Sequence, residues 1–149
     1  AYSIPSYAQG SGKKEPDIVS KITSARSFQI FAQAMNNSGI SSEIKDAGPY
    51  VIFAPPDKAF QKLPPPFVEL LISGQHKSQL QRFVKYHILK NHNGKFQNGK
   101  TELQTLEGGK LTLTNNIDGK KLNLSAHIIG KPVKVSNGLI YVIDLVLLP

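Results

Sequence analysis

The stretch NGLIYVIDLVLLP, residues 137–149, closes the sequence and carries much of its information about the fold. Eight of the ten residues from Leu139 to Leu148 are aliphatic, which is typical of a buried strand. Asp144 interrupts this run, and a buried carboxylate is costly unless several hydrogen-bond donors satisfy it. Two roles are open to it, a catalytic acid or a structural anchor. Catalysis needs a second titratable group in a cleft, and the sequence offers no obvious one, so we expect Asp144 to be structural.

A second informative stretch, YVIFAPPDKAF, spans residues 50–60. It predicts a short buried strand that stops at Pro55, followed by a helix that Pro56 and Asp57 begin. Around it, the N-terminal half of the chain has helical periodicity. Asp17 and Ser27 are candidate N-caps, and Gly39 is suited to end a helix. The helices expected from this pattern cover approximately residues 18–22, 28–38, 56–63, 67–73 and 77–89.

After Asn91 the pattern changes to short alternating runs separated by Asn-Gly, Gly-Gly and Asp-Gly turn signals. The clearest strand is KLTLTNN, where Leu111 and Leu113 alternate with threonines. The strands expected here are residues 110–116, 121–129, 131–135, 139–143 and 145–149. A helical half followed by a strand-rich half predicts an α+β fold in one domain, residues 17–149. Residues 1–16 read as a flexible leader or as the remnant of a signal peptide, and both interpretations stay open.

Three segments in this order resemble the fasciclin domain family. YVIFAPPDKAF resembles its first signature block, NGLIYVIDLVLLP resembles its second, and FVKYHIL (residues 83–89) carries the Tyr-His pair that these domains place at a helix end. The resemblance covers about residues 17–149. It implies a wedge-shaped β-sandwich of about seven strands, with the helical N-terminal half packed on one side. It also implies structural roles for Asp144, Asn137 and Gly138 in the second block.

The function implied by the resemblance is non-enzymatic adhesion by a secreted, periplasmic or cell-surface module that contacts an extracellular protein or an anionic polysaccharide. Some positions depart from the family pattern. Family members usually have Thr, Thr and often His where this chain has Val51, Pro56 and Tyr141. The departures remove polar groups from the region where the two blocks pack, so a partner contact through those groups is not expected.

Composition excludes several classes of site. The chain of 149 residues has 40% apolar and 19% charged residues, which is typical of a globular domain. It has no cysteine, which removes disulfides, zinc–thiolate sites and cysteine nucleophiles. No phosphate-binding loop, dinucleotide fingerprint or nucleophile elbow occurs, and no apolar run has the roughly 20 residues of a membrane span. The four histidines lack the spacing and nearby acids of a metal site, so we expect no metal and no cofactor.

Charge is concentrated in the C-terminal half. Residues 1–75 hold seven Lys and Arg against six Asp and Glu (+1), whereas residues 76–149 hold eleven against four (+7), together the net +8. No acid occurs between Glu69 and Glu102, and such a stretch predicts a surface for an anionic partner or simply a solvated face. Its cationic residues are Lys77, Arg82, Lys85, Lys90, Lys95 and Lys100. No recognisable nucleic-acid module accompanies them, so a nucleic-acid partner is not expected.

Tyr86 and His87 have two interpretations. In the fasciclin family this pair has been linked to receptor-mediated adhesion, which would place both residues at a partner surface. Alternatively, Tyr86 packs at the helix end while His87 caps the last carbonyls and faces the core. We keep both as candidate partner-binding residues.

A second function class is the carriage of a small apolar ligand such as a carotenoid, which some fasciclin-like proteins bind. The stretch PPPFVELLI is apolar around most of a helix's circumference, and such a helix is either deeply buried or in contact with a ligand or partner. Ordinary core packing is the alternative for each residue. The residues predicted to line a ligand groove are Ile40, Pro55, Pro56, Phe67, Val68, Leu71 and Ile72.

Overall fold

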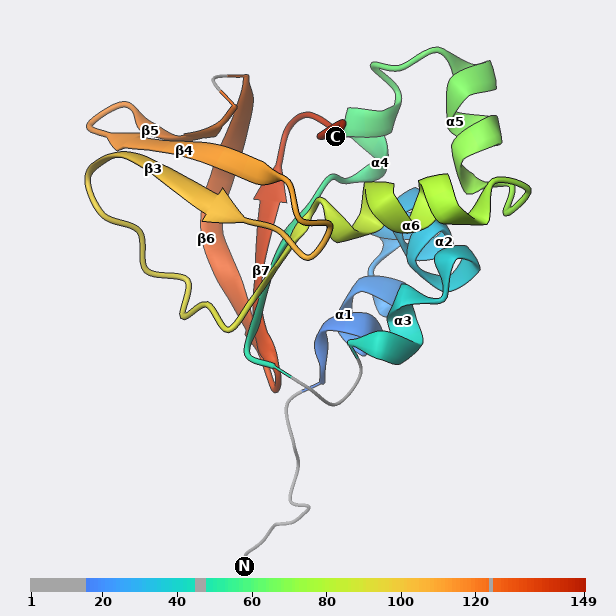
Figure 1. The fold of residues 1–149 in the computed structure, drawn as a ribbon, viewed down its shortest axis with the longest axis horizontal. Helices are drawn as coiled ribbons and strands as arrows, with labels where there is room; N and C mark the ends of the chain where they lie inside the picture. The colour runs from blue at the N-terminus through green and yellow to red at the C-terminus, as the bar shows by residue number, and fades with distance from the viewer. Residues whose placement is uncertain (1–15, 45–47, 124) are drawn as a thin grey trace, which may run out of the picture.

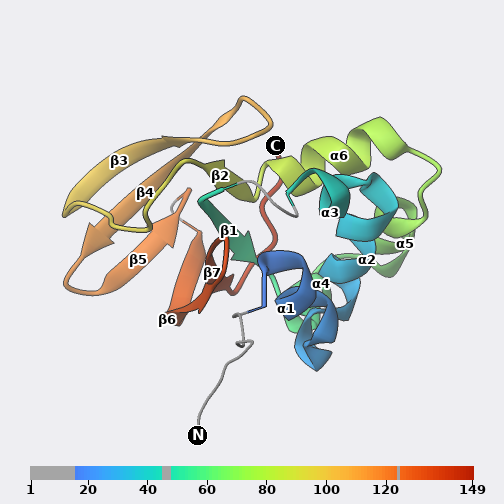
Figure 2. The ribbon, with the colours of Figure 1, turned by 90° about the horizontal axis from the view of Figure 1, so that it is seen from below.

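The computed structural model describes residues 16–44, 48–123 and 125–149. The predicted leader, residues 1–16, lies outside the described residues apart from Pro16. Figure 1 shows a strand layer beside a helical layer, and Figure 2 shows the same division from below. The helices are α1 (Ile18–Ser24), α2 (Gln29–Ser38), α3 (Ile40–Glu43), α4 (Asp57–Phe60), α5 (Pro65–Ile72) and α6 (Lys77–Lys85), with a short 3₁₀ helix at Arg26–Phe28. The strands are β1 (Tyr50–Ala54), β2 (Ile88–Lys90), β3 (Gly99–Gln104), β4 (Lys110–Asn116), β5 (Gly119–Leu122), β6 (Ala126–Val135) and β7 (Gly138–Ile143).

The strands form one seven-stranded sheet in the order β2-β1-β7-β6-β5-β4-β3. The predicted α+β class, with about seven strands and a helical N-terminal half, is therefore confirmed. Strands β1 and β7 are neighbours and run parallel, although most of the chain separates them in the sequence. The two stretches that resemble the family blocks thus lie side by side at the centre of the molecule.

Strand β1 is buried on both faces, and each face belongs to a different core. Tyr50, Ile52 and Ala54 pack against the helices. Val51 and Phe53 point the other way, where the sheet folds over and leucines of β3, β4 and β5 cover them. A register shift in the β6–β7 pairing, between Ile129 and Val133, interrupts the long strand that joins the two parts of the sheet. Because the sheet folds over, β3, β4 and β5 face β1 and form the predicted sandwich. The helices pack on the other face of β1.

The helix ends show which signals act locally. Asp17 caps α1, since its Oδ1 accepts a hydrogen bond from the Ser20 amide at 2.8 Å. Gly39 ends α2 with φ of 83°, in the left-handed region that favours glycine. The prediction that Ser27 caps the next helix is wrong. Asp57 of α4 accepts a hydrogen bond from the Ile30 amide at 2.8 Å, so the start of α2 is satisfied from a distant segment.

Several predicted boundaries are also wrong. Ile88 and Leu89, expected as the end of a helix, belong to β2 because this strand pairs with Tyr50–Ile52 of β1. The expected strands 121–129 and 131–135 are redistributed between β5 and one long strand, β6. Strand β3 was not expected, since Leu103 is its one buried residue and the alternation is weak. The last five residues form no strand, and the Leu147 amide donates to the His87 ring instead.

Candidate functional site

Helix α5 is more apolar than α2 and α6, yet none of its residues is buried. It begins after Pro64, with two prolines in its first turn, and it packs against α2 and α6. Both views place it at the outer edge of the helical layer, away from the sheet. Phe67 is 39% exposed and Leu70 is 48% exposed. The sequence left deep burial and ligand contact open for this helix, and the structure rules out deep burial.

The wider depression beside α5 has a volume of about 310 Å³. Its wall is mostly apolar, with two polar side chains, and comprises Ile30, Phe60, Gln61, Leu63, Pro65, Val68 and Glu69. Three helical segments contribute to it: the start of α2, the region from α4 to its following turn, and one side of α5. This depression is the larger space available to an apolar ligand next to the helix.

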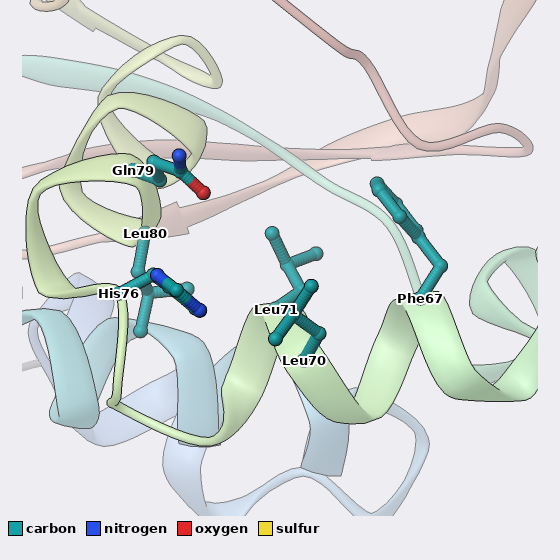
Figure 3. Close-up of a pocket in the computed structure, with 6 residues that line it drawn as sticks. All are labelled: Phe67, Leu70, Leu71, His76, Gln79 and Leu80. Carbon is teal, nitrogen blue, oxygen red and sulfur yellow. The ribbon is translucent and has the colours of Figure 1, made fainter.

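The second depression lies between α5 and α6 and is much smaller, about 40 Å³. Figure 3 shows Phe67 and Leu71 pointing to the same side of α5, with His76, Gln79 and Leu80 across from them. Leu70 completes the wall. The two depressions share α5 as their common wall, so the helix is a ridge of exposed apolar side chains between them.

Helix α5 is anchored although it is exposed. Asn37 of α2 donates a hydrogen bond from Nδ2 to the Ile72 carbonyl at 2.6 Å, which ties down the C-terminal end of the helix. Val68, Leu71 and Ile72 are half-buried and pack against the helical core. Because these contacts hold one side of α5, Phe67 and Leu70 are presented outward on a supported helix.

The prediction of a single ligand groove is wrong. Phe67 and Leu71 line the smaller depression, Val68 lines the larger one, and Pro56 lines a third depression elsewhere. Ile40 and Pro55 are buried in the protein interior, and Ile72 packs on the core. Sequence reasoning did not include Ile30, Leu63, Leu70 and Leu80, which the structure adds to the walls. Leu70 lies within the apolar stretch PPPFVELLI, so the sequence could have indicated it. Ile30, Leu63 and Leu80 lie on other segments, and a local sequence pattern does not show that these segments pack beside α5.

Tyr86 and His87 do not reach a partner surface. The Tyr86 side chain packs in the core of the folded sheet, where its hydroxyl lies 3.3 Å from the Lys110 carbonyl and 3.2 Å from Asn123 Nδ2. His87 is completely buried. The interpretation that both residues contact a partner is therefore wrong, and the alternative, in which Tyr86 packs and His87 meets a helix carbonyl and faces the core, is the one observed. Their location at the junction of α6 and β2 removes them from solvent.

The His87 imidazole joins two distant segments as a neutral ring. Nδ1 lies 2.8 Å from the Phe83 carbonyl and Nε2 accepts a hydrogen bond from the Leu147 amide at 3.1 Å, so the proton belongs on Nδ1. Phe31 and Phe83 pack around the ring, with centroids 5.5 and 4.8 Å away. Burial lowers the pKa of His87 to about 4, although the hydrogen bond to Phe83 acts in the opposite direction.

The six cationic residues of the acid-free stretch are distributed over several elements. Three lie on α6, and the others follow through β2, its connection to β3, and β3 itself, so they span both layers (Figure 1). Arg82 makes an ion pair with Glu107 at 3.2 Å. Within residues 16–44, 48–123 and 125–149, the other five make no ion pair. The six charges are therefore more widely spread over the molecule than their closeness in the sequence suggested.

The three residues expected to be structural occupy the ends of β7. Asn137 Oδ1 accepts from the Ile18 amide at 2.9 Å, and its Nδ2 donates to the Ile44 carbonyl at 2.8 Å, so it links the sheet to the helical layer. A side chain on Gly138 would overlap with the backbone of Tyr50, which explains the glycine. The expectation that Asp144 is buried is wrong. Its side chain is 30% exposed, because β7 ends one residue earlier.

Asp144 nevertheless makes specific contacts. Its Oδ1 accepts a hydrogen bond from the His127 amide at 2.7 Å, and its Oδ2 lies 3.2 Å from His127 Nδ1. Tyr141 lies within β7, at a position where family members often have histidine. Its hydroxyl donates a hydrogen bond to the Gly94 carbonyl at 2.7 Å. Burial raises the pKa of the Tyr141 hydroxyl. These contacts join loops to the central strands.

The sequence model of the fasciclin domain family matches residues 26–149 of this chain. The chain belongs to the fasciclin domain family. It is similar to the uncharacterized protein sll1735 of Synechocystis, with 30% identity over 137 residues that cover 89% of this chain and 98% of that protein. It is also similar to human stabilin-1, with 27% identity over 99% of this chain but 6% of that much longer protein.

A solved structure supports the fold of this fasciclin domain. The pair of FAS1 domains from the insect cell adhesion molecule fasciclin I aligns with a TM-score of 0.74 over 93% of this chain, at 16% identity. The chain spans 52% of that structure. At this identity the likeness speaks for the fold alone.

Family membership indicates a binding or adhesion module as the kind of function. Fasciclin domains are in general non-enzymatic and occur in extracellular or cell-surface proteins. Among the residues that the structure describes, no helix is long and apolar enough to cross a membrane. The same residues include no group of three or more His, Asp or Glu placed to hold a metal ion.

Proposed function

We propose that this fasciclin domain is an extracellular, non-enzymatic binding module that carries an elongated apolar molecule, such as a carotenoid, on helix α5. The observation that supports the proposal is the exposure of a helix that is apolar around most of its circumference. Contiguous exposed apolar surface marks contact with a ligand or partner when the patch is large, whereas single exposed apolar residues are ordinary. In this domain Phe67 and Leu70 form the exposed ridge.

The shape of the surface favours an elongated ligand. A depression lies on each side of α5, so an extended molecule could contact the ridge and continue into the apolar wall formed by Ile30, Leu63 and Val68. Burying such surface yields about 25 cal/mol per Å² of apolar area removed from water. The anchoring of α5 by Asn37 limits the loss of conformational freedom on binding.

The test is pigment retention. The purified protein is mixed with a carotenoid extract and separated by gel filtration, and visible absorbance is measured across the protein peak. The double variant Phe67→Ser, Leu70→Ser should lose most of the bound pigment. The control is Ile117→Ser, Val133→Ser, which removes side chains that are 100% and 37% exposed and lie in the strand layer, between β4 and β5 and on β6. A colourless peak for the unmodified protein, or equal pigment loss in both variants, would contradict the proposal.

A second candidate function is adhesion to an anionic extracellular polymer. It is supported by the five cationic side chains that make no ion pair within the described part of the chain. Their charges would mainly set the association rate and the salt sensitivity of binding. Retention on heparin or alginate at low salt tests this function. The variant Lys90→Gln, Lys95→Gln, Lys100→Gln should elute earlier than the equally charged control Lys120→Gln, Lys131→Gln, Lys134→Gln, and identical elution would reject this surface.

A further inference from the structure

Another depression, about 250 Å³ in volume, lies between α4 and the strands β6 and β7. It belongs neither to the α5 surface nor to the acid-free stretch. Its apolar part is formed by Pro56, Ala59 and Ile129, and its polar part by Lys58, Lys62 and Asp144. Ile129 is 51% exposed, so a large aliphatic side chain faces solvent beside two ammonium groups.

The two lysines have no carboxylate partner within the described residues. Lys62 Nζ donates a hydrogen bond to the Asp144 carbonyl at 2.8 Å, which orients the ammonium group without neutralising it. The Asp144 carboxylate is turned toward His127, whose amide and ring nitrogen contact both of its oxygens. The two ammonium groups are therefore without an ion-pair partner among the described residues, while both oxygens of the Asp144 carboxylate contact His127.

Hydrogen bonds from distant parts of the chain hold the walls of this depression. Asp57, next to Lys58, accepts from the Ile30 amide and so fixes α4 against α2. Lys62 and Asp144 join the end of α4 to the end of β7. The Asp144 amide in turn donates to the His127 carbonyl at 3.1 Å, which continues the connection to β6. A ligand would thus meet a largely preformed surface.

We propose that this depression binds a small amphipathic monoanion, a carboxylate joined to an alkyl or aryl group. Its carboxylate pairs with Lys58 and Lys62, and its apolar part covers Pro56, Ala59 and Ile129. Neither half of the site suffices alone. Exposed ion pairs contribute little by themselves, and the apolar wall is small, so the ligand must satisfy both. The proposal is independent of apolar-ligand binding at α5.

Octanoate is the probe, used below its micelle concentration and followed by amide chemical shifts in ¹⁵N-labelled protein. Acetate keeps the charge without the chain, and 1-octanol keeps the chain without the charge. We expect octanoate to bind more tightly than either, with the largest shifts at Ala59, Ile129 and Asp144. The variant Lys58→Gln, Lys62→Gln should weaken octanoate binding by about fivefold or more, while the equally charged control Lys95→Gln, Lys134→Gln leaves it unchanged.

Three outcomes would overturn the proposal: octanol binding as tightly as octanoate, equal effects of the two lysine variants, or octanoate shifts centred on Phe67 and Leu70. The last outcome would place the anion on the α5 surface. Phe67→Ser, Leu70→Ser keeps the two proposals distinct, because it should abolish pigment retention and leave octanoate binding at the α4 depression intact. Loss of both in this variant would also count against a separate site.

Discussion

Acidification should destabilise this domain through His87. The ring is fully buried, makes one hydrogen bond as a donor and one as an acceptor, and has a pKa lowered to about 4. In the unfolded chain the pKa of a histidine is about 6.5. Between these values the unfolded state binds more protons than the folded state, so the free energy of unfolding falls as the pH falls. The neutral ring's contribution is intact above about pH 6.5 and is lost progressively toward pH 4.

The magnitude follows from the two pKa values. A difference of about 2.5 pKa units corresponds to roughly 3 kcal/mol, of which about 2 kcal/mol is already lost at pH 5. The structural cause is that a proton on Nε2 would face the Leu147 amide, which is itself a donor. Protonation therefore replaces the hydrogen bond between Leu147 and His87 with repulsion between two N–H groups. The rings of Phe31 and Phe83, which pack around the imidazole, offer no water to relieve it.

The assay is urea unfolding at pH 7, 5 and 4, compared between the unmodified protein and His87→Gln. Glutamine does not titrate and can still donate and accept a hydrogen bond. Burial also lowers the pKa of His92, so both proteins lose some stability in acid. The unmodified protein should lose about 3 kcal/mol more than the variant between pH 7 and pH 4. Parallel pH profiles, or a His87 ring resonance that titrates near pH 6.5 in the folded protein, would refute the reasoning.

Three further substitutions test how the layers are joined, each by urea unfolding at pH 7. Gly138→Ala should lower the free energy of unfolding by about 2–3 kcal/mol, since the new methyl group overlaps with the Tyr50 backbone; a neutral effect would contradict this packing. Asn137→Ala should cost about 2 kcal/mol because two backbone groups of the helical layer lose their partner, and a loss below that of a typical surface substitution would count against the link. Asp57→Ala should cost about 1 kcal/mol and speed hydrogen exchange at the Ile30 amide, and unchanged exchange would show that the cap is dispensable.

Local signals in the sequence determined a large part of the fold. Asp17 and Gly39 set the ends of their helices because a cap and a left-handed turn involve neighbouring residues. The alternation around Leu111 and Leu113 predicted β4, since one face of that strand is buried. The two blocks with family resemblance correspond to β1 with its following helix and to β7. Each of these features is encoded within a few residues.

The location of the candidate sites required the tertiary structure. The composition of α5 showed that it is apolar around most of its circumference, but whether other elements cover it depends on how α2, α5 and α6 pack. Likewise Asp57 replaces Ser27 as the cap of α2, and His87 turns inward to meet Leu147. Periodicity reports the environment along one helix or strand, whereas burial and pairing depend on residues that are distant in the chain. For that reason the sequence predicted the elements, and the packing between them decided which apolar and charged surfaces remain open to a ligand.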